Sequence, residues 1–293
     1  MPLILSAPLR RLISGDDAGH TEYVLAMREP GDAGLFGPAS VSWRILAYPA
    51  TLLGGVRALL LQSLDPLTVA GVARHSRFRS EPIGRLQATA RFVTIAAFGS
   101  TEQVAAECAM IRRVHERVKG TTPDGRAYSA SDPKQLLFVH MALVQSFLVA
   151  HREFAPGGLT IVDADRFVEE WNALAPLLGF DSVPLPHTAD ELDRMLEEYG
   201  SGFRAGPDAL EALEFLASPP LPPAMRPGYR LLLTAAAGSL PAYARALLPD
   251  VLPSPSPVVT SFTGSAIVRA LAAVLGPSPA HQAALERLGL TES

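Results

Sequence analysis

This chain contains very little cysteine and lysine, and each shortage narrows its chemistry. Cys108 is the single cysteine, which excludes an internal disulfide framework, and no cluster of Cys and His residues has the spacing of a zinc site. Lys119 and Lys134 are the two lysines beside 23 arginines, so few lysines remain for catalysis.

The common signatures of nucleotide and hydrolase chemistry are also missing. The sequence has no Gly-x-Gly-x-x-Gly after a predicted strand, no phosphate-binding loop and no Gly-x-Ser-x-Gly elbow. The net charge is −4 and no basic face stands out, which argues against nucleic acid as a partner. Hydrolase, nicotinamide-dependent and nucleic-acid-binding functions therefore have no support.

Long apolar runs are absent as well. The longest candidate, residues 135–150, contains His140 and Gln145 and falls short of the roughly 20 residues that a membrane span needs. The apolar run at the N-terminus precedes Arg10 and Arg11 instead of following them, unlike a secretory signal. We therefore expect a soluble, cytoplasmic protein without a membrane span.

What the sequence does contain is a large apolar fraction with helical periodicity. Hydrophobic residues make up 48% of the chain and strand signals are weak, so we expect an all-α protein with one large domain and about ten helices. Residues 1–40, rich in Gly and Pro, are expected to form an irregular wrap. Residues 41–250 are expected to form the helical catalytic domain, and residues 251–293 a Pro-rich linker followed by a C-terminal helical pair. This pair packs either on the body or on a partner subunit, which leaves a homodimer open.

Several predicted helices begin at recognisable caps. Asp65-Pro66, Glu81-Pro82 and Asp132-Pro133 each fit an N-terminus, Ser100 with Gln103 and Thr188 with Glu191 fit capping boxes, and Pro49 starts or kinks the first helix. The predicted helices span about residues 42–63, 66–75, 82–98, 101–119, 133–152, 163–178, 188–201, 208–217, 225–248, 261–275 and 279–288.

His115 is the most informative polar residue because it interrupts the apolar stripe of the helix 101–119. The stripe otherwise consists of Val104, Cys108, Ile111 and Val118. A buried imidazole needs hydrogen-bond partners or a metal. His115 is therefore either a core residue bonded to a backbone carbonyl or to Glu107, or the axial ligand of a haem iron. Cys108, two turns earlier, is better explained as a small buried apolar residue than as a thiolate ligand.

His140 lies on the buried face of the next long helix, in line with Leu136 and Leu143. It is a second axial ligand, a distal hydrogen-bond donor or a satisfied core residue. His151 lies at the end of that helix, where a cation would favour the helix dipole, and is expected to be structural.

Arg85 and Thr89, at i and i+4, interrupt another apolar helix face. A buried guanidinium requires an anion, which is a haem propionate, a polarised oxygen species or an ordinary Asp or Glu. Thr89 either joins this site or bonds back to the carbonyl of Arg85.

Several stretches, in order, resemble a known family. They are Leu-Leu-Gly-Gly-Val-Arg-Ala-Leu-Leu-Leu-Gln at 52–62, Val-Ala-Gly-Val-Ala-Arg-His-Ser at 69–76, Gly-Arg-Leu-Gln-Ala-Thr at 84–89, Phe-Gly at 98–99, Arg-Val-His at 113–115, Tyr-Ser-Ala-Ser-Asp-Pro at 128–133 and Val-His at 139–140. Together they are similar to the catalytic domain of the MpaB and rubber oxygenase (latex-clearing protein) family, over roughly residues 45–250.

The resemblance implies a globin-like helical core that holds b-type haem and attacks apolar isoprenoid or polyketide chains with dioxygen. The Arg-x-x-His segment of the rubber oxygenases, which carries the proximal histidine, matches Arg112 to His115. Their Arg-x-x-Lys-Thr pattern falls on Arg85, Ala88 and Thr89, so alanine replaces the lysine that is the distal iron ligand there. The sixth position is then open, water-bound or taken by His140.

Two further positions compare differently with the family. Asp65-Pro66 stands where many relatives carry His-Pro. His140 matches a histidine usual in the bacterial branch and not in the rubber oxygenases.

We therefore expect a haem-dependent oxygenase in which His115 binds the iron, and Arg85 and Arg112 help to hold the haem. Arg85, Thr89 and His140 are the expected catalytic residues, and the partners are a hydrophobic small molecule and dioxygen. Two alternatives remain: a non-haem metal oxygenase using His115, His140 and a carboxylate, and a non-enzymatic helical protein that binds a hydrophobic ligand.

Overall fold

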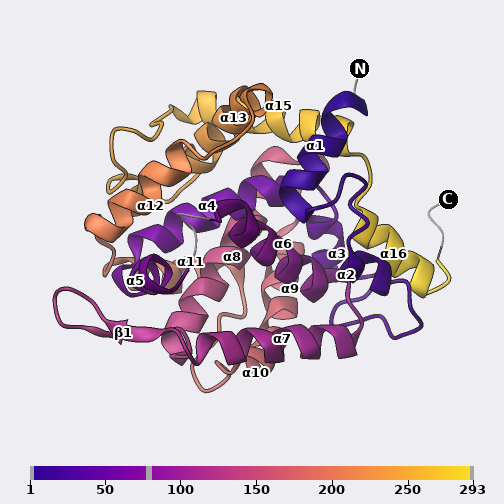
Figure 1. Ribbon diagram of the computed structural model, residues 1–293, viewed down its shortest axis with the longest axis horizontal. Coiled ribbons are helices and arrows are strands. Elements are labelled where there is room, and N and C mark those ends of the chain that lie inside the picture. Colours follow the sequence, from indigo (N-terminus) through magenta and orange to yellow (C-terminus); the bar gives the residue numbers. More distant parts are fainter. Residues whose placement is uncertain (1–2, 77–80, 291–293) are drawn as a thin grey trace.

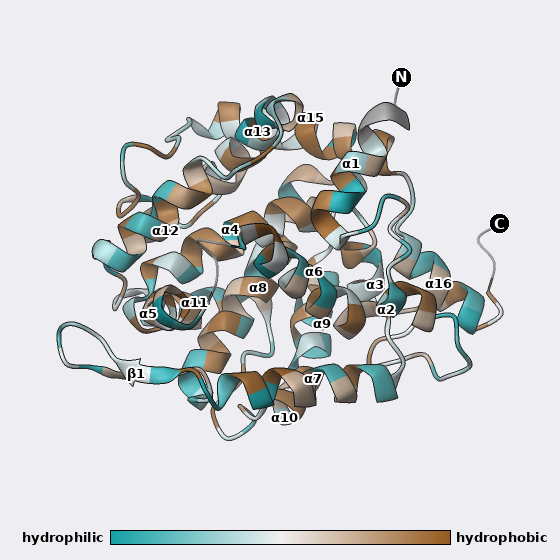
Figure 2. Cartoon of the chain, viewed as in Figure 1, coloured by the Kyte–Doolittle hydropathy of each residue, from teal (hydrophilic) through white to brown (hydrophobic). Residues whose placement is uncertain are grey.

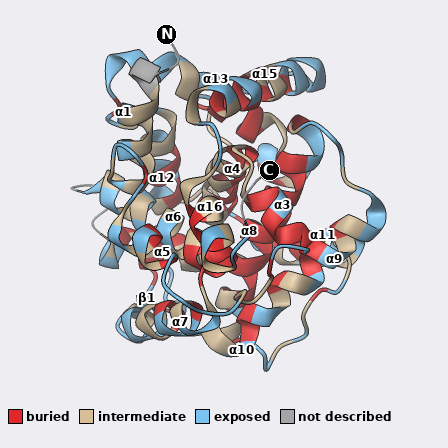
Figure 3. Ribbon diagram, turned by 90° about the vertical axis from the view of Figure 1, so that its right-hand side faces the viewer, coloured by how far each residue is buried: buried red, intermediate tan, exposed pale blue. Residues whose placement is uncertain are grey.

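Helix α8 (Pro133–Phe154) runs through the middle of the protein in the computed structural model (Figure 1). Every residue from 140 to 151 is buried, and α8 is largely red among the paler outer helices in Figure 3. The helix begins where the sequence predicts, because the Asp132 carboxylate accepts hydrogen bonds from the backbone N–H groups of Lys134 and Gln135 at 2.8 and 3.2 Å.

The structure describes residues 3–76 and 81–290. Around α8 these residues form further α-helices, two short 3₁₀ helices and one two-stranded antiparallel hairpin. In chain order the other elements are α1 (Leu3–Ser14), α2 (Glu22–Ala26), α3 (Val41–Leu46), α4 (Ala50–Leu64), α5 (Pro66–His75), α6 (Pro82–Phe98), α7 (Thr101–His115), β1 (Lys119–Thr121), β2 (Ala127–Ser129), α9 (Ile161–Trp171), η1 (Asn172–Leu174), α10 (Ala175–Leu178), α11 (Ala189–Gly200), α12 (Pro207–Ala217), η2 (Pro223–Met225), α13 (Arg226–Gly238), α14 (Ala242–Arg245), α15 (Pro257–Leu275) and α16 (Pro279–Arg287).

α4 packs closely against α8 because a glycine lies where they cross. A Cβ at Gly54 would lie 2.8 Å from a ring carbon of Phe147 and 2.9 Å from the Ser146 carbonyl oxygen. One turn further along α4, the fully buried Arg57 donates hydrogen bonds to the side chains of Gln145 and Ser146 on α8 and to the Ser239 carbonyl. This guanidinium joins α4, α8 and the end of α13.

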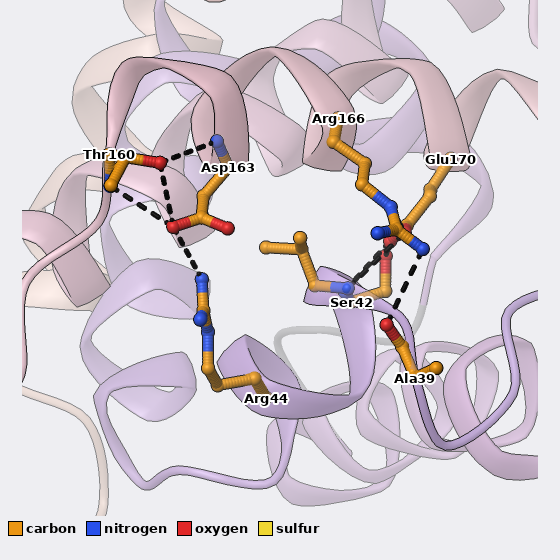
Figure 4. A network of polar contacts seen from close by, with 8 residues as sticks. Ala39, Ser42, Arg44, Thr160, Asp163, Arg166 and Glu170 are labelled. Carbon is orange, nitrogen blue, oxygen red and sulfur yellow. Dashed lines mark hydrogen bonds and ion pairs between the residues drawn. The ribbon is translucent and has the colours of Figure 1, made fainter.

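A polar network joins α3 to α9 on the outside of the core (Figure 4). The Glu170 carboxylate accepts a 2.8 Å hydrogen bond from the backbone N–H of Ser42 at the start of α3, and Arg166 holds the same carboxylate at 2.9 Å. Arg44 forms an ion pair with Asp163 at 2.9 Å. Glu170 thus supplies an acceptor to the unpaired N–H groups at the helix start.

The outer helices are arranged on opposite sides of α8. In Figure 1, α1, α13 and α15 cover the upper side, and α7 and α10 lie along the lower edge beside the hairpin. The antiparallel hairpin pairs Lys119 with Ser129 and directly follows α7. The candidate site residues of α7 therefore lie far from α15.

The predicted fold class is confirmed: the described residues form one all-α domain with a single small hairpin. The predicted starts at Asp65, Ser100 and Asp132 are confirmed as side-chain N-caps. Thr188 also caps its helix, but the Glu191 carboxylate accepts from the His187 N–H, so this is not a capping box.

Other local predictions are wrong. Residues 3–14 and 22–26 are helical although an irregular segment was expected, because α1 packs against α6 and α15 and α2 packs against α16. The predicted helices 42–63, 163–178 and 225–248 are each divided, the first and third at Pro49 and at residues 239–241 before α14. The helix predicted to reach Lys119 ends at His115, where the chain turns into the hairpin.

Two helices, α8 and α15, are long and apolar enough to cross a membrane among the described residues, judged by length and composition. The bent pair of α4 and α5 would be a third if it formed one span. The apolar segment of α8 is 78% buried, as expected for a core helix, whereas that of α15 is 28% buried. The expectation that no segment reaches this length is wrong for both helices. α8 extends to 22 residues, and residues 257–260 belong to α15 and not to the preceding Pro-rich stretch.

Candidate functional site

His115 and Arg112, one turn apart on α7, line a cavity of about 180 Å³. The capping box of Ser100 and Gln103 fixes the start of α7, so the register of this helix follows from its sequence. α10 and the start of α8 form the other walls. The lining residues are Arg112, His115, Glu116, Ser131, Leu136, Leu178 and Gly179.

The His115 imidazole is half-buried and neutral at pH 7. Burial lowers its pKa below the ordinary value, and the nearby charge of Arg85 lowers it further. No hydrogen bond joins its ring to another residue in the described parts of the chain. Glu107, the partner considered from the sequence, is instead bound by Arg91 at 2.7 Å, so that explanation of His115 is wrong.

Arg85, on α6, does not line this cavity, but its charge acts on the His115 imidazole. Its side chain is half-buried, and burial lowers the pKa of its guanidinium. Within residues 3–76 and 81–290, no carboxylate forms an ion pair with it. A desolvated cation beside a neutral imidazole leaves positive charge uncompensated, which favours the binding of an anion between α6 and α7.

Thr89 lies one turn beyond Arg85, and its hydroxyl donates a 3.2 Å hydrogen bond to the Arg85 carbonyl. This is the local helical bond considered from the sequence. Ala88, which stands where the rubber oxygenases carry lysine, is exposed. Neither residue lines the cavity beside His115.

His140 is separate from this cavity. Its buried ring lies 5.1 Å from the ring of Phe180 and 6.2 Å from that of Trp171, measured between centroids. Burial lowers its pKa to about 4, and the side chain of Asn172 opposes this shift only in part. The structure therefore places His140 as a neutral ring in an aromatic pocket between α8 and α9.

The other two titratable candidates have core environments. Burial raises the pKa of the Cys108 thiol to about 11, assisted by Glu107, so the thiol stays protonated and is no thiolate ligand at neutral pH. Burial and then Arg44 lower the pKa of His151 to about 4, so it is neutral and not the helix-end cation expected.

Asp65 has a local structural role. Its carboxylate accepts a 2.8 Å hydrogen bond from the backbone N–H of Thr68 and caps α5, while burial raises its pKa. The aspartate before Pro66 therefore gives a hydrogen-bond acceptor to an otherwise unpaired N–H group at the start of α5.

The donor set fits a haem better than a free metal ion. One neutral imidazole with a free nitrogen suits an axial ligand, and the uncompensated Arg85 suits a propionate. No group of three His, Cys, Asp or Glu residues that would hold a metal ion occurs in the described ranges, so His115, His140 and a carboxylate do not gather there as a non-haem site. The 180 Å³ cavity is smaller than the roughly 300–1,000 Å³ of ordinary cofactor pockets, so a haem requires α7 to move away from α10 and the start of α8.

Four wall residues were not foreseen from the sequence: Glu116, Ser131, Leu178 and Gly179. The sequence signal that could have indicated this wall was the glycine after a short apolar segment. Gly179 has φ +88° and ends α10. Arg57 was also missed as a buried polar centre, although it interrupts an otherwise apolar helix.

The fold and the site define an all-helical protein with a neutral histidine at an arginine-flanked cavity. The chain belongs to the family described as ER-bound oxygenase mpaB/B′/rubber oxygenase, catalytic domain, which matches residues 43–284. This confirms the resemblance seen in the sequence and makes the protein an oxygenase, an enzyme of the oxidoreductase class. The match continues through α15 into α16. No curated protein and no solved structure matches the chain.

Proposed function

We propose that this protein is a haem b-dependent oxygenase that uses dioxygen to hydroxylate or cleave a hydrophobic carbon chain of the isoprenoid or polyketide type. The observation that carries the proposal is the action of the Arg85 charge on His115, which lines the cavity together with Arg112. It joins an imidazole kept neutral by burial to a guanidinium with no carboxylate partner among the described residues. Family membership supports the oxygenase chemistry.

In this proposal His115 would bind the haem iron, and Arg85 and Arg112 would hold the propionates. Neutrality of His115 is the protonation state that an axial ligand needs, so its lowered pKa favours binding near pH 7. When bound, the haem supplies the iron that activates dioxygen.

The chain supplies apolar surface for a hydrophobic substrate. Phe92 continues the Arg85 and Thr89 face of α6, and Leu136 and Val139 lie on α8, with Leu136 in the cavity wall; all three are half-buried. Apolar walls hold a hydrophobic chain and keep water from the reacting atoms. The Thr89 hydroxyl reaches a polar substrate group only after it leaves the Arg85 carbonyl.

The test is titration of the purified protein with haemin, followed by the Soret absorption. We expect wild type to bind one haem and His115→Ala to bind at least about tenfold more weakly with an altered band. Arg85→Leu should weaken binding without changing the band, because it removes a propionate partner and no iron ligand.

His140→Ala is the matched control, because it removes a second histidine whose ring does not line the cavity. It should leave the Soret band unchanged. A band altered by His140→Ala and not by His115→Ala would contradict this assignment of the axial ligand. Consumption of oxygen with a hydrophobic substrate in the absence of haem would contradict the proposed cofactor.

A further inference from the structure

Three helices on one side of the fold carry arginines and no acidic residue. α1, α13 and α15 together contain five arginines and no Asp or Glu. All 29 acidic residues of this chain of net charge −4 lie elsewhere. These three helices lie together on one side of the molecule (Figure 1), called the basic side below for its arginines, although Glu153 of α8 lies beside the start of α15.

The same side exposes apolar side chains on α15. Val258 and Phe262 are 79% and 72% exposed and lie one turn apart. Arg269, two turns beyond Phe262, lies on the same face and is exposed. Figure 2 shows the mostly apolar α15 on the upper edge of the molecule. An exposed aromatic and aliphatic stripe that carries an arginine is unusual on a water-facing helix.

The opposite face of α15 is fixed to the protein. Thr260, Gly264 and Val268 are buried, and α15 packs along α13. A Cβ at Gly264 would come within 2.4 Å of ring atoms of Phe154, so this helix and α8 are in close contact. α15 therefore lies flat on the protein, and its outer stripe is available as it stands without unpacking.

Two arginines of this side have no ion-pair partner in the described parts of the chain: Arg230 on α13 and Arg269 on α15. The others are engaged, since Arg11 pairs with Asp17, and Arg10 and Arg226 donate to backbone carbonyls. The exposed apolar stripe thus has free positive charge beside it and no acidic residue on its own helix or on α13.

We propose that the outer face of α13 and α15 binds the surface of a lipid bilayer that contains anionic lipids, with α15 parallel to the membrane plane. Phe262 and Val258 enter the headgroup boundary, and Arg230 and Arg269 contact lipid phosphates. This combination of apolar side chains and arginines is the chemistry of interfacial helices. A second copy of the chain fits less well, because a twofold contact through this face brings arginines against arginines.

The proposed surface is independent of the haem proposal. α7 and α10, whose residues line the cavity, lie on the opposite edge of the molecule in Figure 1, so bilayer binding leaves the His115 site away from the lipid. The surface tethers the enzyme and does not form the cavity.

The test is co-sedimentation of the full chain with vesicles of phosphatidylcholine, with and without phosphatidylglycerol. We expect binding to the anionic vesicles that weakens at high salt. The double variant Val258→Ser/Phe262→Ser should bind vesicles at least about tenfold more weakly, since it removes the two apolar side chains that would enter the bilayer. Arg269→Glu should weaken binding to anionic vesicles and leave any binding to neutral ones unchanged.

Ile161→Ser/Val162→Ser is the matched control, because these α9 side chains are 82% and 75% exposed and lie outside the basic side. It should bind vesicles like wild type. Equal loss in both double variants, or no binding of wild type to anionic vesicles, would overturn the proposal. A dimer on size exclusion that Phe262→Ser dissociates, without vesicle binding, would assign this face to a second copy instead.

Discussion

At the scale of single residues, burial decides the protonation of the histidines. His140 and His151 both lie in the core, and burial lowers the pKa of each to about 4. The structure therefore holds two neutral imidazoles that would be partly charged near pH 6 in the unfolded chain. Each makes the folded state sensitive to acid.

This gives a prediction for stability against pH. Between pH 6.5 and about 4, His140 and His151 are protonated in the unfolded chain but stay neutral in the folded core. The free energy of unfolding therefore falls as the pH falls. From pH 7 to pH 5 each buried histidine should remove about 2 kcal/mol. Urea unfolding at the two pH values measures this loss.

His140→Phe keeps a ring of similar shape but cannot titrate, so it should reduce that loss by about 2 kcal/mol. His187→Gln is the control, because the His187 ring is exposed. If His140→Phe and wild type lost the same stability on acidification, the neutral buried state of His140 would be refuted.

Residue-scale reasoning from the sequence brought part of the site together. Arg112 and His115 were both expected at the site and line one cavity, whereas Arg85 acts on His115 through its charge and does not line that cavity. His140 was expected there as well, but helical periodicity shows only that a side chain is buried and not which buried neighbours it meets. Its ring meets Phe180 and Trp171, which come from later in the chain.

At the scale of elements, the helix starts were predictable because their signals are local. Asp65, Ser100 and Asp132 each bond to an N–H two or three residues ahead, and the sequence alone contains both partners. The end of α7 at His115 was not predictable, because the following hairpin depends on pairing with residues 127–129. α1 was missed because it contains Pro8 and owes its position to packing on α6 and α15.

The contact between α4 and α8 gives a prediction with an internal control. Gly54→Ala would place a methyl group 2.8 Å from the Phe147 ring and should destabilise the fold by roughly 1–3 kcal/mol. Gly55→Ala meets nothing within 4 Å and should stabilise the helix by up to about 1 kcal/mol. Urea unfolding of both variants checks the opposite signs, and equal changes would contradict the close packing at Gly54.

At the scale of the whole molecule, composition and periodicity were sufficient to predict an all-α domain. The family match over residues 43–284 then assigns it to the oxygenases. The division at residue 250 stays a prediction, as does the globin-like core, because no solved structure matches the chain. The gathering of α1, α13 and α15, which contain no acidic residue, on one side is a property of the fold, since α1 is far in sequence from the other two.

The absorption spectrum of the purified wild-type protein, oxidised and then reduced with dithionite, tests the central claim most directly. Protein produced with added haem precursor should show an intense Soret band that shifts on reduction. The intensity of the band should correspond to about one haem per chain. Protein that shows no Soret band as purified and gains none when haemin is added would contradict the account.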